Sequence, residues 1–241
     1  MKSQYLLITC MKVKKSKIYG IGILIIMLSL SLGIGRSYYS GKLPLISESR
    51  IANKVNNVNI QELSPSDYVR YITDDENGLI DTKEIGRYKF ELQYKPIDFL
   101  ALRFYNKTQD KKNFQEEIQN RIGLQYYTLK IGLTDSNNDI MTDNLISNDD
   151  YYKRVEYFSF GIQRDLKVVS NRDTFDCKLL HFERVYGLTQ YITFTLGFEA
   201  NDSDKKIYEK VFIYDDKIFS TGTIKLRIKE EALSNIPKLI I

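Results

Sequence analysis

The sequence predicts a mainly β protein (β-rich α+β), built from an antiparallel sheet or a β-sandwich with a few short helices. Several segments alternate strictly between apolar and polar residues, and short connections separate them. Alternation with period two places one face of a strand in a core and the other in solvent, whereas the strands of a parallel α/β sheet are continuous apolar runs. The composition, 43% hydrophobic and 27% charged, is that of a globular protein and excludes disordered and collagen-like classes.

The first 35 residues form an export segment. They contain five lysines and no acidic residue: Lys2, Lys12, Lys14, Lys15 and Lys17. Residues 18–35 are uncharged and mostly apolar, and at about 1.5 Å per residue they would span roughly 27 Å as a helix. This pattern fits both a cleaved signal peptide and a retained N-terminal membrane anchor. Because the basic flank stays in the cytoplasm, we expect the rest of the chain to be extracytoplasmic, in the periplasm or at the cell surface.

The excess positive charge also lies in this leader. The formal net charge is +4, from 35 basic and 31 acidic residues, and all the acidic residues lie beyond residue 35. The remainder is nearly neutral, so we expect no nucleic-acid partner. Residues 36–60, rich in Ser, Asn and Gly, predict a linker or arm, and residues 61–241 predict one β-rich domain.

Three segments of the body carry helix signals. Ser64, Pro65 and Asp67 predict an N-cap and a helix as far as about Ile72. A second helix is predicted from apolar residues at helical spacing, before a candidate C-cap at Gly123: Phe114, Ile118 and Ile122. A third is predicted from Ser147, with Asp150 three residues later and one apolar stripe: Tyr151, Val155 and Phe158.

Seven segments are predicted as strands. The first follows Arg87 and ends before Pro96, with one apolar face: Tyr88, Phe90, Leu92 and Tyr94. The others cover residues 124–133, 160–169, 174–182, 190–198, 207–214 and 223–229. A turn at residues 186–189 between two of these segments favours a hairpin.

Residues 73–84 resemble the calcium-binding loop of an EF-hand. Five of its positions hold suitable residues: Asp75, Asn77, Gly78, Asp81 and Glu84. Thr73 replaces the first Asp, however, and the residues after Glu84 alternate as a strand where the motif needs a second helix. We therefore expect an acidic turn and no tight calcium binding. A second acidic loop departs further from the pattern: Asp135, Asn137 and Asp139.

Few residues of the body offer catalytic chemistry. His181 is the only histidine, and Cys177 is the only cysteine after the leader. Alternation predicts both on one strand face about 13 Å apart, too far for a catalytic pair, so we expect core or near-core residues. Glu183 and Glu199 are candidates for acid and base across a hairpin, but many such pairs arise by chance among 31 acidic residues. The sequence thus assigns no catalytic residue, no metal site and no cofactor.

Three stretches of the body resemble uncharacterised envelope proteins and lipoproteins of Bacteroidetes-type bacteria. They are GLIDTKEIGRYKFELQYKPIDFLAL (Gly78–Leu102), HFERVYGLTQYITFTLGF (His181–Phe198) and LSNIPKL (Leu233–Leu239). The resemblance implies an exported, β-rich protein of the periplasm or surface and carries over no functional residue. Unlike the lipoprotein members, this chain has no Cys after the apolar segment, so a lipid anchor is not expected.

We expect an exported cell-envelope protein that is a structural or binding module rather than an enzyme. Its expected partners are envelope proteins or glycans, and the membrane if residues 18–35 are retained. The alternatives are a secreted carbohydrate-active hydrolase with a carboxylate pair and a calcium-dependent adhesion module using residues 75–84. Two facing carboxylates in a pocket would favour the hydrolase, and an exposed aromatic or apolar patch without them would favour the binding module.

Overall fold

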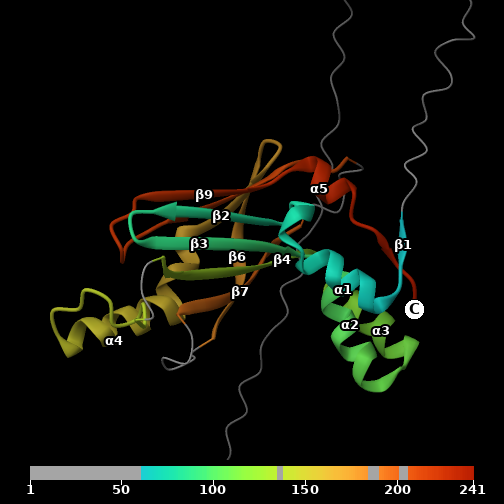
Figure 1. Ribbon diagram of the computed structural model, residues 1–241, viewed down its shortest axis with the longest axis horizontal. Helices are drawn as coiled ribbons and strands as arrows, with labels where there is room; N and C mark the ends of the chain where they lie inside the picture. Colours follow the sequence, from blue (N-terminus) through green and yellow to red (C-terminus); the bar gives the residue numbers. More distant parts are fainter. Residues whose placement is uncertain (1–60, 135–137, 184–189, 201–205) are drawn as a thin grey trace, which may run out of the picture. The chain divides into compact units, whose positions relative to one another are not determined.

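The computed structural model describes residues 61–134, 138–183, 190–200 and 206–241. In these residues the main element is an eight-stranded antiparallel sheet with strand order β2-β3-β4-β7-β6-β5-β8-β9 (Figure 1). A parallel pair of two-residue strands, β1 and β10, lies beside it. The predicted mainly β class, an antiparallel sheet with short helices, is confirmed.

Most of the predicted strands are present with small shifts at their ends. The strands have these bounds: β1 Glu62–Leu63, β2 Ile80–Ile85, β3 Tyr88–Lys95, β4 Leu124–Leu133, β5 Leu166–Ser170, β6 Asp173–Glu183, β7 Tyr191–Glu199, β8 Lys210–Asp215, β9 Thr223–Ile228 and β10 Lys238–Leu239. The predicted alternation of buried and exposed residues in β3 is confirmed at Phe90 and Leu92, which are fully buried, and at Lys89, which is exposed. The predicted turn at 186–189 lies outside the described residues.

The sheet curls until its two edge strands approach each other. β2 and β9 lie in contact, and the backbone N–H of Arg227 in β9 donates to the Asp81 carboxylate in β2 at 2.6 Å. The inward faces of all eight strands therefore surround one core, rich in Phe, Leu, Ile and Tyr. Phe158 packs into this core with its ring 5.5 Å from that of Phe194 and 6.0 Å from that of Phe219.

Helices lie at both ends of the curled sheet (Figure 1). Their bounds are α1 Pro65–Thr73, α2 Ile97–Thr108, α3 Lys111–Gln119, α4 Asn148–Glu156 and α5 Glu230–Ser234. Two predicted caps are confirmed: Ser64 Oγ accepts from the Asp67 N–H, and Ser147 forms a capping box with Asp150. α4 lies at the end of the β2–β3 turn, and α1 and α5 lie at the opposite end (Figure 1).

Four details of the sequence prediction were wrong. Helix α2 was not predicted, because Phe99, Leu100 and Leu102 were interpreted only as a short apolar stretch after Pro96. The next helix ends before Gly123, since its C-cap is Asn120, and Ile122 is 51% exposed. Strand β2 was assigned to an acidic turn. Residues 157–165 form a π-turn and a 3₁₀-turn ahead of β5, because Phe158 and Ile162 continue the buried stripe of α4 into the core.

A buried carboxylate organises the turn between β8 and β9. Asp216 accepts hydrogen bonds from the backbone N–H groups of Ile218, Phe219 and Thr221, at 2.8 to 3.0 Å. The hydroxyls of Thr221 and Tyr214 also donate to it. Hydrogen bonds to a charged group contribute more than neutral ones, and their loss would leave several donors unpaired.

We predict that Asp216→Ala lowers the free energy of unfolding by about 3 kcal/mol, because it removes the common acceptor of these donors. The neighbouring Asp215 is the matched control: its side chain is half-exposed and pairs with Lys217 at the surface, so Asp215→Ala should cost much less than Asp216→Ala. Urea denaturation of both variants measures the difference. Equal losses for the two variants would contradict the organising role of Asp216.

Candidate functional site

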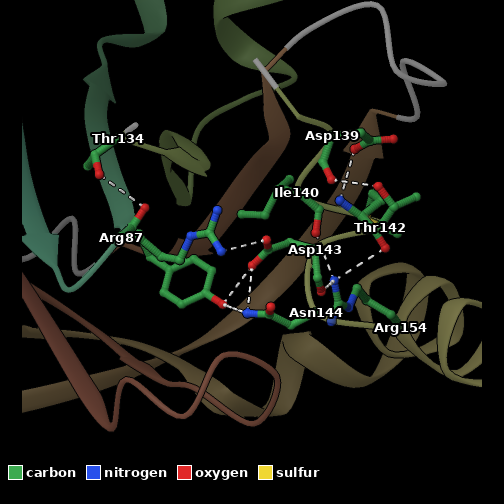
Figure 2. Close-up of polar contacts among 10 residues, drawn as sticks. Arg87, Thr134, Asp139, Ile140, Thr142, Asp143, Asn144 and Arg154 are labelled. Atoms are coloured by element: carbon green, nitrogen blue, oxygen red, sulfur yellow. Dashed lines mark hydrogen bonds and ion pairs between the residues drawn. The ribbon is translucent and has the colours of Figure 1, made fainter. Parts of the chain in front are cut away.

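A buried ionic cluster lies at the α4 end of the sheet. The Asp143 side chain is only 6% exposed, and its carboxylate accepts from the Tyr88 hydroxyl at 2.9 Å and from the Asn144 amide at 3.2 Å (Figure 2). Arg87 forms an ion pair with it at 3.2 Å. Burial, and then the hydrogen bond to Asp143, raise the pKa of Tyr88, so this phenol stays a hydrogen-bond donor.

Arg154 fixes the chain segment that carries Asp143. Its Nη1 donates to three backbone carbonyls, those of Ile140, Met141 and Asp143, at 2.8, 3.2 and 3.0 Å (Figure 2). The guanidinium lies 5.4 Å from the centre of the Phe219 ring, and burial lowers its pKa. Asp143 and Arg154 are thus occupied by internal partners, so the cluster holds the residues between β4 and α4 against the core.

The residues of the calcium-like loop belong to three different elements. Thr73 ends α1 and donates to the Val69 carbonyl, and Asp75 begins a 3₁₀-turn. Asp81 and Glu84 lie in β2, where Asp81 accepts from the backbone of β9. In the described residues no group of three or more His, Cys, Asp or Glu side chains is placed to hold a metal ion.

Only one residue of the second acidic loop can be placed. Asp139 accepts from the Met141 N–H at 2.9 Å, which stabilises the backbone of the segment held by Arg154. Asp135 and Asn137 lie outside the described residues. The expectation that these loops bind no calcium tightly stays a prediction.

Cys177 and His181 do not share a strand face, contrary to the sequence prediction. A β-bulge shifts the register of β6 between Cys177 and Leu179, so the residues after it point to the opposite side. Cys177 is buried, its thiol donates to the Leu179 carbonyl at 3.1 Å, and burial raises its pKa to about 11. His181 is exposed on the outer face, so its expected core position was wrong.

Glu183 and Glu199 do not face each other either. Glu183 is opposite Thr193 of β7, whereas Glu199 ends β7 and is opposite Leu124 of β4. Six residues along a strand correspond to about 20 Å. Glu199 forms an ion pair with Lys178 instead, at 3.3 Å. This candidate acid–base pair is therefore excluded by the register.

The outer face of the sheet carries a continuous polar row. Cross-strand neighbours from β2 to β6 follow in this order: Thr82, Glu91, Lys130, Thr193 and Glu183. The Lys130 ammonium lies 2.8 Å from the Glu91 carboxylate. Since side chains directly opposite each other on one face are close enough to interact, this row presents alternating donors and acceptors to solvent.

A hollow of about 350 Å³ lies beside this row. Its lining comes from β2, β3, β4, β7 and the residues next to them: Glu84, Lys89, Glu91, Lys130, Gly132, Leu133, Thr134, Gln190 and Tyr191. The Tyr191 residue is 41% exposed, and Lys130 Nζ lies 5.2 Å from the centre of its ring. The hollow therefore combines an exposed aromatic ring with two carboxylates and two ammonium groups.

Gly132 leaves space for the Tyr191 backbone at the rim of the hollow. It is opposite Tyr191 in the register of β4 and β7. A Cβ atom at position 132 would lie 3.1 Å from both Tyr191 Cβ and the Gln190 carbonyl oxygen. The absence of a side chain at Gly132 thus leaves space for the backbone and Cβ of Tyr191 at the rim of the hollow.

Lys95 adds a titratable amine to the same outer face. It is opposite Tyr126, and its Nζ lies 4.8 Å from the centre of the Phe99 ring. Burial and the nearby Lys130 ammonium lower its pKa to about 8, although Glu91 opposes the shift. Near neutral pH this amine remains mostly charged, so it adds positive charge near the hollow.

Comparisons with known proteins add no identification. No family model matches the chain, and no curated protein or solved structure is similar to it. In the part of the chain that the structure describes, no helix is long and apolar enough to cross a membrane. The assignment of function therefore rests on the geometry of the outer face.

For the buried cluster, we predict that Arg154→Met lowers the free energy of unfolding by about 3 kcal/mol, because three carbonyls lose their common donor. Lys153→Met is the control, since the Lys153 side chain is exposed and pairs with Asp150 at 3.8 Å. Guanidinium denaturation compares the two variants. A loss of stability in the control as large as in Arg154→Met would show that Arg154 has no special role.

Proposed function

We propose that the protein is an exported cell-envelope binding module and that its outer sheet face binds glycans. The observation that carries this proposal is the hollow in which the exposed Tyr191 ring lies beside the Glu91–Lys130 ion pair. An apolar ring face suits the C–H surface of a sugar, while charged groups hydrogen-bond to its hydroxyls. The volume of about 350 Å³ lies in the range of small-molecule sites.

The contacts around the hollow support recognition of hydroxyl groups. Glu91 offers carboxylate oxygens and Lys130 an ammonium donor in one row, and Lys89, opposite Gly132 in the next row, offers a second ammonium group. Because these residues lie on β-strands, their backbone positions are fixed before a ligand binds. Binding of a ligand against Tyr191 would therefore cost the protein little conformational entropy.

A hydrolase is the second candidate, since Glu84 and Glu91 line the same hollow. Acid–base hydrolysis of a glycoside needs one carboxyl group to be protonated. Both carboxylates have lysine neighbours instead: Lys130 forms an ion pair with Glu91, and Lys89 is opposite Glu84 on β3. The geometry thus supports binding of a sugar more strongly than its cleavage.

We predict that the full-length protein, kept in detergent, binds members of an oligosaccharide panel and that Tyr191→Ala weakens binding about tenfold, or about 1.4 kcal/mol. Tyr152→Ala is the matched control, because this exposed tyrosine lies on α4 and does not line the hollow, so its loss should change nothing. Glycan arrays followed by calorimetry measure both effects.

Three outcomes of this experiment would contradict glycan binding at the hollow. One is the absence of binding to every oligosaccharide, and another is equal affinity of Tyr191→Ala and the unchanged protein. The third is that the unchanged protein releases new reducing ends from an oligosaccharide and Glu91→Gln does not. This result would establish the hydrolase instead.

For localisation we predict that cell fractionation recovers the protein outside the cytoplasm, because a lysine-flanked apolar segment orients the following chain outward. N-terminal mass spectrometry of the purified protein distinguishes cleavage near Gly35 from a retained anchor. Recovery of the uncleaved chain as a soluble cytoplasmic protein would contradict the proposed export.

A further inference from the structure

A second pocket, of about 230 Å³, lies at the end of the curled sheet next to α5. Its lining residues come from β3, β5, β6, β8, α5 and their neighbours: Tyr94, Ser170, Phe175, Lys206, Ile207, Tyr208, Lys210, Leu233 and Ile236. In Figure 1 this is the α5 end, opposite the end that holds α4 and the buried Asp143 cluster. The pocket is thus separate from the glycan-binding hollow on the outer face.

The register shows that this pocket is the open end of the core. Tyr94 follows Phe90 and Leu92 on the inward face of β3. Phe175 is opposite the buried Val168, and Ser170, two residues further along β5, is opposite Lys210. Inward-facing positions of four strands therefore converge at this pocket.

Hydroxyl groups in this pocket lack hydrogen-bond partners. Ser170 is only 8% exposed, yet within the described residues its hydroxyl forms no hydrogen bond. The Tyr94 hydroxyl also forms no hydrogen bond with the described residues. Ser170 and Tyr94 both line the pocket, so their hydroxyls are available to donate to a ligand that enters it.

Tyr94 and Ser170 are suited to donate to an anion. Burial, and then the charge of Asp98, raise the pKa of Tyr94, so its hydroxyl remains protonated. Ser170 stands opposite Lys210 on the inward face, which places a hydroxyl donor next to an ammonium group. Lys206, with its Nζ 5.2 Å from the centre of the Tyr208 ring, is a second cation at the rim.

The remaining lining of the pocket is apolar, and none of its lining residues is acidic. Phe175, Ile207, Leu233 and Ile236 form the apolar part. A fully hydrated inorganic anion gains nothing from such a surface, whereas a molecule with one charged end and an apolar body matches both parts. The volume lies below the range of about 300–1,000 Å³ for drug-sized ligands, which restricts the ligand to a small molecule.

We propose that this pocket binds a small monocarboxylic acid with an apolar body. The carboxylate accepts from Ser170 and pairs with Lys206 at the rim, and the apolar body lies against Phe175, Leu233 and Ile236. It is independent of the proposed glycan binding, because the two sites share no residue.

The test is calorimetric titration of the full-length protein in detergent with hexanoate, corrected by titration into protein-free detergent. We expect saturable binding of hexanoate and at least tenfold weaker binding of hexan-1-ol, which has the same apolar body without the charge. Ser170→Ala should weaken hexanoate binding about tenfold, and Lys206→Gln about threefold. Lys217→Gln, which changes an exposed lysine in the β8–β9 turn, and Tyr191→Ala should leave it unchanged.

The proposal is overturned by any of three results: no saturable binding of hexanoate, equal affinity for hexan-1-ol, or unchanged affinity in Ser170→Ala. Competition by inorganic phosphate at the same concentration as hexanoate would also overturn it, because the apolar half of the pocket would then contribute nothing. Denaturation curves of each variant, measured alongside, show whether Ser170→Ala is folded. If Ser170→Ala does not fold, the comparison of hexanoate with hexan-1-ol on the unchanged protein still tests the proposal.

Discussion

Closure of the sheet is the constraint on which the other features depend. An eight-stranded antiparallel sheet that stayed flat would expose the backbone groups of β2 and β9 and leave its aromatic face in water. Here the edges approach, Asp81 accepts from the backbone of Arg227, and the inward face becomes a core. A curled sheet has two open ends, and the protein treats them differently: α4 and Phe158 close one, whereas the other retains a pocket.

The bulge in β6 is a local device that accompanies this curvature. An extra residue bends and twists a strand, and it also exchanges the faces of all residues that follow it. Before the bulge Cys177 points inward, and after it Leu180 and Phe182 pack toward the core while His181 points outward. Gly197 is opposite Leu179 at this point, where a Cβ atom would lie 3.1 Å from Leu179 Cβ. Glycine therefore allows the two strands to approach closely at this point.

Local signals predicted the parts of the fold that local energetics determine. The alternation of Phe90 and Leu92 and the caps at Ser64 and Ser147 appear in the structure because each depends on neighbours within a few residues. The face of His181 depends on a bulge that sequence alternation does not reveal. The outer hollow was also missed, because Glu84, Lys130 and Tyr191 are far apart in sequence and only strand order brings them together.

The two candidate sites differ because they lie on opposite faces of the same sheet. On the outer face, charges such as Glu91 and Lys130 remain hydrated and pair across strands, so they favour a polar ligand that exchanges hydrogen bonds with water at little net cost. At the open end of the core, the hydroxyls of Ser170 and Tyr94 form no hydrogen bond with the described residues and line a pocket that also has apolar walls. A ligand there can accept hydrogen bonds from these hydroxyls and also bury apolar surface. The same closure that buries the core therefore creates one site that depends on surface complementarity and another that combines hydroxyl donors with apolar contact.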